Sequence, residues 1–141
     1  MTVAFGSDHG GYALKSALIK YFADKGYGVI DVGTDTEQSC DYPVYAKSAC
    51  AKVLSGEADR AILICKTGIG MTIAANKIRG IRAADISDEY SAKMCRAHNN
   101  CNVMCIGAFL CEEDKAKKLA DIFLASDFEG GKHARRVDML E

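Results

Sequence analysis

The segment Ala61-Ile62-Leu63-Ile64-Cys65-Lys66-Thr67-Gly68-Ile69-Gly70 decides the fold class of this chain. Its first five residues are apolar throughout, which is typical of a β-strand buried on both faces. The glycines at positions 68 and 70 predict a tight loop, and Met71 to Lys77 can form the helix that follows. A buried strand, a glycine-rich loop and a helix in this order are typical of a parallel α/β sheet.

The same alternation of strand and helix extends along the rest of the chain. Further strands are expected at residues 2–6, 29–32, 81–85 and 102–106, and further helices over 11–25, 43–56, 88–97 and 112–123. In the first helix, Leu14, Leu18 and Phe22 share an apolar face and the lysines lie on the other. We predict an α/β fold, a Rossmann-like three-layer α/β/α sandwich with a five-stranded parallel sheet. Residues 1–141 are expected to form one domain, with residues 128–141 as a C-terminal tail.

Composition excludes several classes of protein. The 141 residues carry 18 Lys and Arg against 19 Asp and Glu, so a formal charge of −1 gives no bulk attraction to nucleic acid or an anionic membrane. No stretch approaches the roughly 18 apolar residues of a membrane span. The seven cysteines are odd in number and form no CxxC pair, which indicates free thiols in a reducing compartment. We therefore expect a cytoplasmic protein that binds neither nucleic acid nor membrane.

Cys65 and the loop after it are the first candidates for chemistry. Ligands of an open parallel sheet bind beyond the carboxyl ends of the strands, where Cys65 stands. The N-terminus of the following helix can bind phosphate or stabilise an oxyanion, and it favours a thiolate at Cys65 that could act as base or nucleophile. From these residues alone, packing as a small buried side chain is a more common role for Cys65 than catalysis. The same role is expected for the cysteines at 50, 95, 101, 105 and 111.

Three other polar groups each have a functional and a plain interpretation. Asp8-His9 follows the first strand and could bind a ligand, or could be a helix cap and a surface histidine. His98-Asn99-Asn100 could belong to a site or simply end a helix. The basic cluster from Lys132 to Arg136 could clamp a phosphoryl group or form a solvated surface.

The order in which these motifs occur carries more information than any of them alone. The chain contains, in sequence, Gly6-Ser-Asp-His-Gly-Gly, Asp41-Tyr-Pro, Ile64-Cys-Lys-Thr-Gly-Ile-Gly-Met-Thr-Ile-Ala-Ala-Asn-Lys, Gly80-Ile-Arg-Ala, Arg96-Ala-His-Asn and Glu129-Gly-Gly-Lys-His-Ala-Arg-Arg-Val. Together these segments resemble the type B ribose-5-phosphate isomerase family, which also contains galactose-6-phosphate and allose-6-phosphate isomerases. The resemblance covers nearly the whole chain and includes all three histidines.

The resemblance implies a metal-free aldose–ketose isomerase that needs no cofactor and acts on ribose 5-phosphate and ribulose 5-phosphate, in the pentose phosphate pathway. Cys65 then matches the base that moves a proton between C2 and C1 through a cis-enediolate. Thr67 and the surrounding loop match the segment that holds the sugar oxygens and the enediolate charge. The substrate-binding residues of that loop are Lys66, Gly68, Ile69 and Gly70.

The remaining matches lie elsewhere in the chain. His98 matches the acid that assists ring opening, and Asn99 matches a substrate-binding asparagine. Asp8 and His9 match residues at the sugar and phosphate ends, and Tyr42 matches a pocket tyrosine. The phosphate-binding pair of the family corresponds to Lys132 and Arg136, which gives the tail a role in phosphate and dimer contacts.

Several positions depart from the family pattern. The family usually has glycine where this chain has Lys66, and arginine where it has Lys132 and Phe109. A lysine at 132 lacks the bidentate fork that arginine offers a phosphate. These departures leave the preferred sugar open, and Lys66 could supply a replacement charge. The chain also ends at Glu141, somewhat early for the family.

Topology predicts that one chain does not complete the site. Cys65 ends a strand, whereas His98 and Asn99 precede the start of the next, so they belong to opposite edges of the sheet. Five residues of strand at about 3.3 Å each separate these edges by on the order of 15 Å. We therefore predict a homodimer with shared active sites, in which His98 and Asn99 come from the partner, with a tetramer as the open alternative.

Three other functions remain as alternatives at this point. The closest is an isomerase of a six-carbon sugar phosphate, either allose or galactose 6-phosphate. A non-catalytic phosphate-binding module is disfavoured, because a binder needs no proton shuttle. The absence of CxxC disfavours a thiol redox protein.

Overall fold

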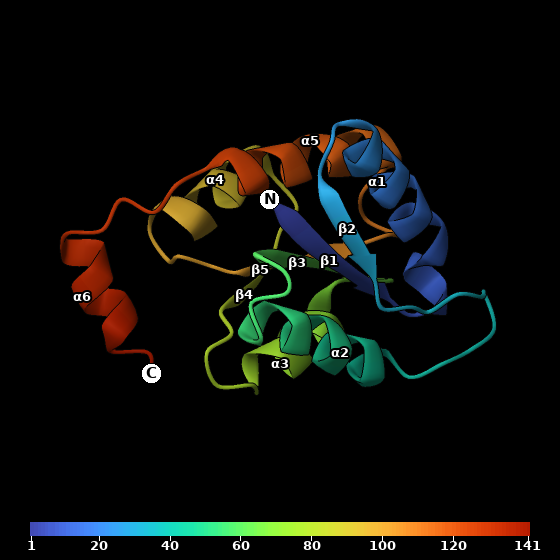
Figure 1. Cartoon of the computed structure of the whole chain (residues 1–141), viewed down its shortest axis with the longest axis horizontal. Coiled ribbons are helices and arrows are strands. Elements are labelled where there is room, and N and C mark those ends of the chain that lie inside the picture. Colours follow the sequence, from blue (N-terminus) through green and yellow to red (C-terminus); the bar gives the residue numbers. More distant parts are fainter.

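The computed structural model describes all 141 residues as a five-stranded sheet between layers of helices (Figure 1). The strands are β1 (Thr2–Ser7), β2 (Gly28–Asp31), β3 (Arg60–Cys65), β4 (Ala83–Asp85) and β5 (Val103–Gly107). The helices are α1 (Tyr12–Asp24), α2 (Tyr42–Leu54), α3 (Ile69–Asn76), α4 (Glu89–Ala97), α5 (Glu113–Ala125) and α6 (Lys132–Asp138), with a short 3-10 turn, η1 (His9–Gly11), before α1. None of the helices is both long and apolar enough to cross a membrane.

All strand pairs are parallel and the strand order is β2-β1-β3-β5-β4. Helices α1, α4 and α5 pack on one face around a core that includes Phe5, Phe22 and Phe123. Helices α2 and α3 cover the other face around Leu63 and Met71. This arrangement confirms the predicted three-layer α/β/α sandwich with a five-stranded parallel sheet.

Local signals in the sequence account for most helix boundaries. The carboxylate of Asp88 accepts a hydrogen bond from the amide of Ser91 at 2.8 Å and so caps α4. Pro43 lies in the first turn of α2, where its missing N–H costs nothing. Gly26, with φ of +92°, follows the end of α1.

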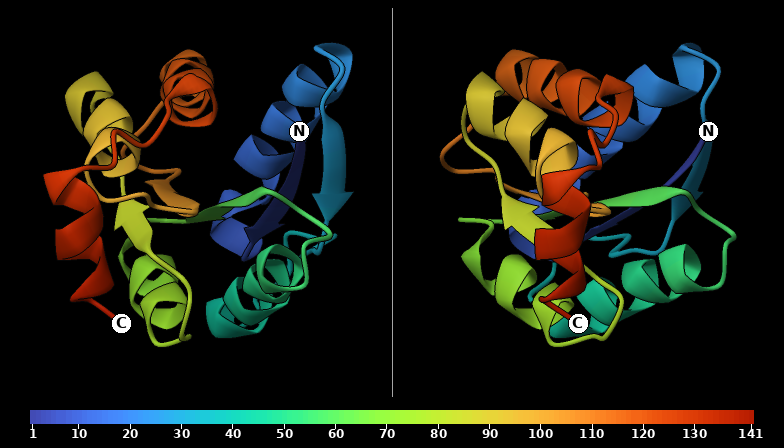
Figure 2. Two further views of the ribbon diagram at one scale, coloured as in Figure 1. Left: turned by 60° about the vertical axis from the view of Figure 1, so that its left-hand side comes forward. Right: turned by 90° about the vertical axis from the view of Figure 1, so that its left-hand side faces the viewer.

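Most element ends lie within two residues of the expected ones, and three differences affect the site or the tail. Helix α3 begins at Ile69 rather than at Met71, so Ile69 and Gly70 belong to its first turn. Strand β4 covers only 83–85 because the amide of Ile81 donates to Ile78 and that of Arg82 donates to the side chain of Asn102. Residues 132–138 of the tail form α6, which lies outside both layers beside the β4 edge (Figure 2).

One lysine of α1 is not on the solvent face. Lys15 is fully buried, and its ammonium group donates to the Asp31 carboxylate and, at 2.7 Å, to the carbonyl of Thr34. The charge is tolerated because both groups satisfy it directly. Lys15 thereby fixes the start of the loop that leads from β2 to Tyr42.

Candidate active site

The carboxyl ends of β1 and β3 form the crevice where a ligand is expected in this topology. The chain passes from β1 to β2 on one side of β1 and then crosses from β2 to β3 on the other side, which makes β1 and β3 the switch point of the sheet. Ser7 pairs with Ile64 in register, and the amide of Asp8 donates to the Ile64 carbonyl at 3.3 Å. Asp8 and His9 therefore lie beside Cys65 and the loop that follows it.

Cys65 lies at the end of β3 and is only 5% exposed. The amide of Gly68 donates to its sulfur at 3.2 Å, a contact that is stronger to a thiolate than to a thiol. Gly68 has a φ of +81°, and a Cβ there would collide with the Asp85 carboxylate. Gly68 is the N-cap of α3, so this amide belongs to the free N–H groups at the positive end of the helix dipole. The loop thus offers an anchored sulfur beside groups that can stabilise a developing negative charge.

Three predicted residues surround this loop. One carboxylate oxygen of Asp8 caps η1 by accepting from the amides of Gly10 and Gly11 at 2.9 and 3.2 Å. The Nδ1 atom of His9 accepts from the amide of Cys40 at 3.2 Å, so the neutral ring carries its proton on Nε2. The ring of Tyr42 lies against Gly70, where an added Cβ would come within 2.6 Å of it.

Lys66 and Phe109, two of the departures from the family pattern, meet at this edge. The ammonium group of Lys66 lies 5.5 Å from the centre of the Phe109 ring, and the amide of Phe109 donates to the Lys66 carbonyl at 3.0 Å. Thr67 is exposed, and its hydroxyl accepts from the amide of Ile69 at 3.2 Å. Lys66 and Thr67 are therefore both accessible to a ligand.

His98 and Asn99 lie at the opposite edge of the sheet. Strand β5 starts at Val103, which pairs with Ala61, whereas Cys65 pairs with Gly107. Asn100 adopts a left-handed conformation (φ 49°), and the amide of Cys101 donates back to the carbonyl of Cys95 at 2.9 Å. This helix-ending motif fixes His98 and Asn99 at the amino edge, which confirms the predicted separation from Cys65.

Helix α6 brings further groups to His98. The rings of His98 and His133 are stacked, with centres 4.1 Å apart and planes 7° from parallel. Burial, with a further contribution from the neighbouring His98, lowers the pKa of His133. His98, Asn99, His133 and Arg136 line a hollow of about 290 Å³. Lys132 is exposed on the same helix.

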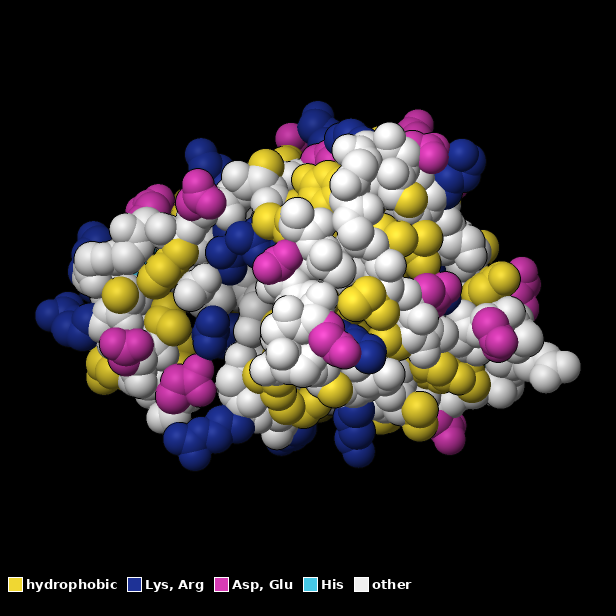
Figure 3. Space-filling model, in the orientation of Figure 1, with side chains coloured by type: hydrophobic (Ala, Val, Ile, Leu, Met, Phe, Trp, Pro, Cys, Tyr) yellow, Lys and Arg dark blue, Asp and Glu magenta, His cyan; other side chains and the backbone are white.

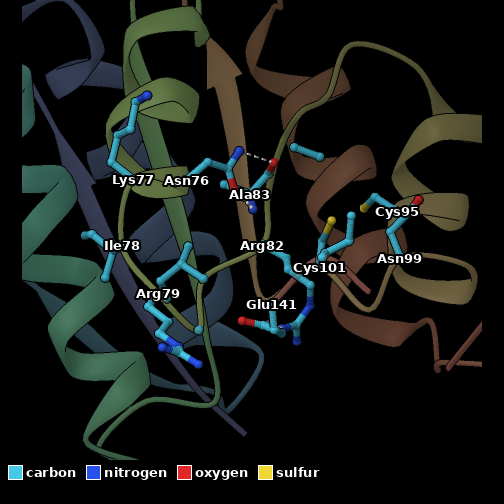
Figure 4. A pocket seen from close by; sticks show the side chains of 14 residues that line it. Asn76, Lys77, Ile78, Arg79, Arg82, Ala83, Cys95, Asn99, Cys101 and Glu141 are labelled. Carbon is cyan, nitrogen blue, oxygen red and sulfur yellow. Dashed lines mark hydrogen bonds and ion pairs between the residues drawn. The ribbon is translucent and has the colours of Figure 1, made fainter. Parts of the chain in front are cut away.

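A larger hollow of about 760 Å³ lies between α6 and the β4 edge, and of the predicted site residues it includes only Asn99. Figure 3 shows this face hollowed, with Lys and Arg side chains around the opening. Figure 4 shows Arg79 and Arg82 on one side and the α4 end on the other. An ion pair of 3.0 Å between Arg82 and Glu141 ties the chain end to this wall.

The structure thus divides the predicted residues into two groups. The carboxyl-edge group contains Asp8, His9, Tyr42, Cys65, Lys66, Thr67, Gly68, Ile69 and Gly70. The amino-edge group contains His98, Asn99, Lys132 and Arg136.

Sequence reasoning did not assign Asp85 or Glu129 to a site, and it considered His133 only as part of the basic cluster at 132–136. Asp85 ends β4 and lies against Gly68, and burial raises the pKa of its carboxyl group. Its position at the carboxyl end of a predicted strand could have marked it as a candidate site residue in the sequence. Glu129 and His133 are four residues apart; α6 brings His133 to His98, and a hydrogen bond from the Glu129 amide to Ala97 brings Glu129 there. Among the other cysteines, the five expected to pack in the core are all buried.

Comparison with known proteins supplies the identification. A family model described as ribose/galactose isomerase matches residues 3–140. The chain belongs to the ribose/galactose isomerase family. It is 43% identical over 138 residues to ribose-5-phosphate isomerase B of Escherichia coli K12, which covers 98% of this chain and 93% of that protein. The resemblance inferred from the motifs is confirmed, and so is the expected enzyme class, an isomerase.

Solved structures of ribose/galactose isomerases have the same fold. The structure of ribose-5-phosphate isomerase B from Clostridium thermocellum superposes with a TM-score of 0.98 at 44% identity, covering 99% of this chain and 95% of that one. That of the enzyme from Mycoplasma genitalium, described with bound ribulose-5-phosphate, gives a TM-score of 0.94 at 36% identity, over 99% and 93% of the two chains.

Proposed function

We propose that this isomerase interconverts ribose 5-phosphate and ribulose 5-phosphate, with Cys65 as the base that moves the proton. The observation that carries the proposal is the Gly68 amide held 3.2 Å from the Cys65 sulfur at the start of α3. A thiolate in this position lies beside backbone donors that can hold the charge of an enediolate. The relatives named ribose-5-phosphate isomerase B support the choice of substrate.

The proton transfer follows from the groups at the carboxyl edge. The Cys65 thiolate removes the C2 proton of the open-chain aldose, and the electron pair forms the C1–C2 double bond as negative charge moves to O1. Amides of the first turn of α3 stabilise that charge. The O2 proton moves to O1, and the Cys65 thiol returns its proton to C1, which leaves a carbonyl at C2.

Substrate orientation follows from the tautomer of His9 and the charge of Lys66. Because Nδ1 of His9 accepts from Cys40, its Nε2–H is available to donate to a sugar or phosphate oxygen. Lys66 is exposed, its side chain lies against Gly10 next to His9 in the chain, and it adds a positive charge that suits a phosphate.

We further propose that the working form is a homodimer with shared sites, in which the partner contributes the acid His98 together with Asn99, Lys132 and Arg136. The separation of the two edges supports this assignment, since His98 does not lie on the side of Cys65. Ile69 and Ile73 are each 56% exposed next to the Cys65 loop, and Val44 is 60% exposed on α2. A second copy would remove this apolar surface from water. A tetramer would consist of two such dimers.

All seven cysteines are free thiols, which supports a cytoplasmic location, where the environment is reducing. Lys66 and Phe109, which both depart from the family pattern, lie together beside the Cys65 loop. A six-carbon sugar phosphate is the competing substrate to test.

A kinetic comparison tests the substrate. The purified protein is assayed with ribose 5-phosphate, allose 6-phosphate and galactose 6-phosphate, with Cys65→Ala measured alongside. We expect the largest kcat/KM for ribose 5-phosphate and none of this activity in Cys65→Ala. A larger kcat/KM for either six-carbon substrate would transfer the proposal to that sugar.

A further inference from the structure

Two of the seven cysteines lie at opposite ends of the turn that follows α4. Cys95 is in the last turn of the helix, and Cys101 follows the left-handed residue Asn100. Both side chains belong to the same apolar core and are 6% and 5% exposed. They also line the larger hollow between α6 and the β4 edge, where Figure 4 shows their sulfur atoms directed toward each other. We refer to Cys95 and Cys101 as the thiol pair.

The backbone holds the thiol pair at a separation that a disulfide can span. The amide of Cys101 donates to the carbonyl of Cys95 at 2.9 Å. Whatever the angle of that hydrogen bond, standard backbone dimensions then keep the two Cα atoms within about 6.8 Å of each other. Disulfides join Cα atoms about 4.4–6.8 Å apart. Formation of the bond therefore does not require the end of α4 to unfold.

A hydrogen bond between the two thiols makes them chemically unequal. It lowers the pKa of Cys101 against the effect of burial, and the charges of Arg82 and Arg96 lower that pKa further. The same hydrogen bond, together with burial, raises the pKa of Cys95. The Cys95 sulfur also lies 3.3 Å from the carbonyl of Ala92, a second acceptor for its proton. Cys101 therefore ionises first, and the thiolate is the form that reacts with oxidants.

We propose that Cys95 and Cys101 form a reversible disulfide when the protein meets a peroxide. The Cys101 thiolate attacks one oxygen of hydrogen peroxide, the O–O bond breaks, and hydroxide leaves a sulfenic acid on Cys101. The Cys95 sulfur then attacks the Cys101 sulfur, and the S–O bond breaks as the hydroxyl group departs with the Cys95 proton as water. The two thiols lose two electrons to the peroxide, which is reduced to water. A dithiol reductant reverses the reaction by thiol–disulfide exchange.

The surroundings of the thiol pair suit this chemistry. The hollow of about 760 Å³ gives a small oxidant access to both residues. Cys111 is a contrasting thiol of the same core, since it is also 6% exposed and burial raises its pKa. Disulfides of proteins in a reducing compartment are usually transient and serve catalysis or redox sensing. The thiol pair therefore fits a modification that forms under oxidation and is removed afterwards.

Oxidation of the thiol pair has a consequence for catalysis that rests on the proposed function. His98 and Asn99 lie between the two cysteines in the chain, so the disulfide closes a loop of seven residues around them. The sulfur atoms must approach to about 2.05 Å, which draws the ends of this loop together and shifts both side chains. Because small displacements of positioned groups slow a reaction, we expect oxidation of the pair to lower kcat by about tenfold.

Peptide mapping of the full-length protein tests the bond itself. The Cys65→Ala variant, which lacks the proposed base, is treated with hydrogen peroxide, unfolded, alkylated and digested with trypsin. Cleavage after Arg96 separates the two cysteines, so the disulfide joins peptide 94–96 to peptide 97–115. We expect this cross-link, assigned to Cys101 by fragmentation, and its loss on treatment with dithiothreitol. Complete alkylation of both thiols after exposure to peroxide would overturn the proposal.

Single substitutions in the same background test the role of each thiol, and melting temperatures establish that every variant is folded. Cys111→Ala is the matched control and should keep the cross-link. Cys95→Ser removes the second thiol, so dimedone should trap a sulfenic acid on Cys101. Dimedone on Cys95 in Cys101→Ser, with none on Cys101 in Cys95→Ser, would overturn the proposed order of attack.

Activity separates the disulfide from its consequence. Wild-type protein and Cys101→Ala are treated with peroxide and then with dithiothreitol, so that oxidation of Cys65 contributes equally to both. We expect a larger reversible loss of kcat in the wild type. Should the cross-link form while the reversible losses are equal, the modification site stands and its effect on His98 is contradicted. The cross-link in Cys65→Ala is measured without isomerase activity, so a failure of the proposed function leaves that result intact.

Discussion

The two edges of the sheet are built in different ways. At the carboxyl edge, backbone geometry organises the site, since the Gly68 amide holds the Cys65 sulfur at 3.2 Å and glycine alone fits against Asp85. At the amino edge, the left-handed turn at Asn100 ends α4, and side chains add to it through the stack of His98 on His133 and their approach to Glu129. The carboxyl-edge sulfur is therefore held by backbone within one chain, whereas the amino edge presents exposed side chains, among them Asn99, Lys132 and Arg136.

The largest effect should come from the anchored sulfur. We expect Cys65→Ala to lower kcat by about 10²–10⁴-fold, because it removes the proposed base. Cys50→Ala, which changes a buried thiol of the same core, is the matched control and should retain its activity. A loss of less than tenfold in folded Cys65→Ala would remove Cys65 from the role of base.

The next effect tests whether backbone geometry forms the carboxyl edge. Gly68→Ala should destabilise the protein by about 2–4 kcal/mol, since backbone strain and a clash with Asp85 act together. Gly56 has the same φ of +81° but no atom within 4 Å of an added Cβ, so Gly56→Ala should show only the strain, about 1–2 kcal/mol. Equal losses in chemical denaturation would show that the packing at Gly68 contributes nothing.

A smaller effect tests the helix end at the amino edge. Asn100→Ala places a side chain with less tolerance for the left-handed region at φ 49° and removes the bond from Arg96 to the Asn100 amide oxygen. We expect a loss of about 1–2 kcal/mol in thermal unfolding. Asn100→Gly loses the same hydrogen bond without the strain and should be the more stable of the two variants. A higher stability for Asn100→Ala than for Asn100→Gly would contradict the left-handed helix end at Asn100.

The smallest effect concerns the exposed charge of Lys66. Lys66→Met should raise KM about threefold with little change in kcat, because solvent screens an exposed ion contact to phosphate. Lys66→Arg retains the charge and should keep the wild-type KM. An unchanged KM in Lys66→Met would show that Lys66 does not contact the substrate.

The sequence predicted the carboxyl edge well because its signals are local. A continuous apolar run, two glycines and the following helix lie within sixteen residues, from Ala61 to Asn76. The start of α3 was placed two residues late, since Ile69 and Gly70 resemble loop residues but form its first turn.

The amino edge and the buried lysine were harder to predict because they depend on contacts between distant segments. Lys15 is buried by partners sixteen and nineteen residues away, which helical periodicity does not register. The approach of His133 to His98 requires α6, whose seven residues carry no strong helical pattern. His98 was found through its motif, and His133 was considered only within the basic cluster at 132–136. Glu129 became a candidate only in the fold, where its amide donates to Ala97.

The shared site between two copies is the central claim, and mixed dimers test it most directly. Cys65→Ala and His98→Ala chains with different tags are co-expressed, both parents are assayed alone, and the mixed dimer is isolated by both tags. If His98 acts across the interface, a mixed dimer contains one intact site of two, so the isolated mixed dimer should have about half of wild-type activity. Because about half of the dimers in a random mixture are mixed, the unfractionated sample should have about a quarter. If both parent proteins are inactive and the isolated mixed dimer is inactive as well, the shared site is contradicted.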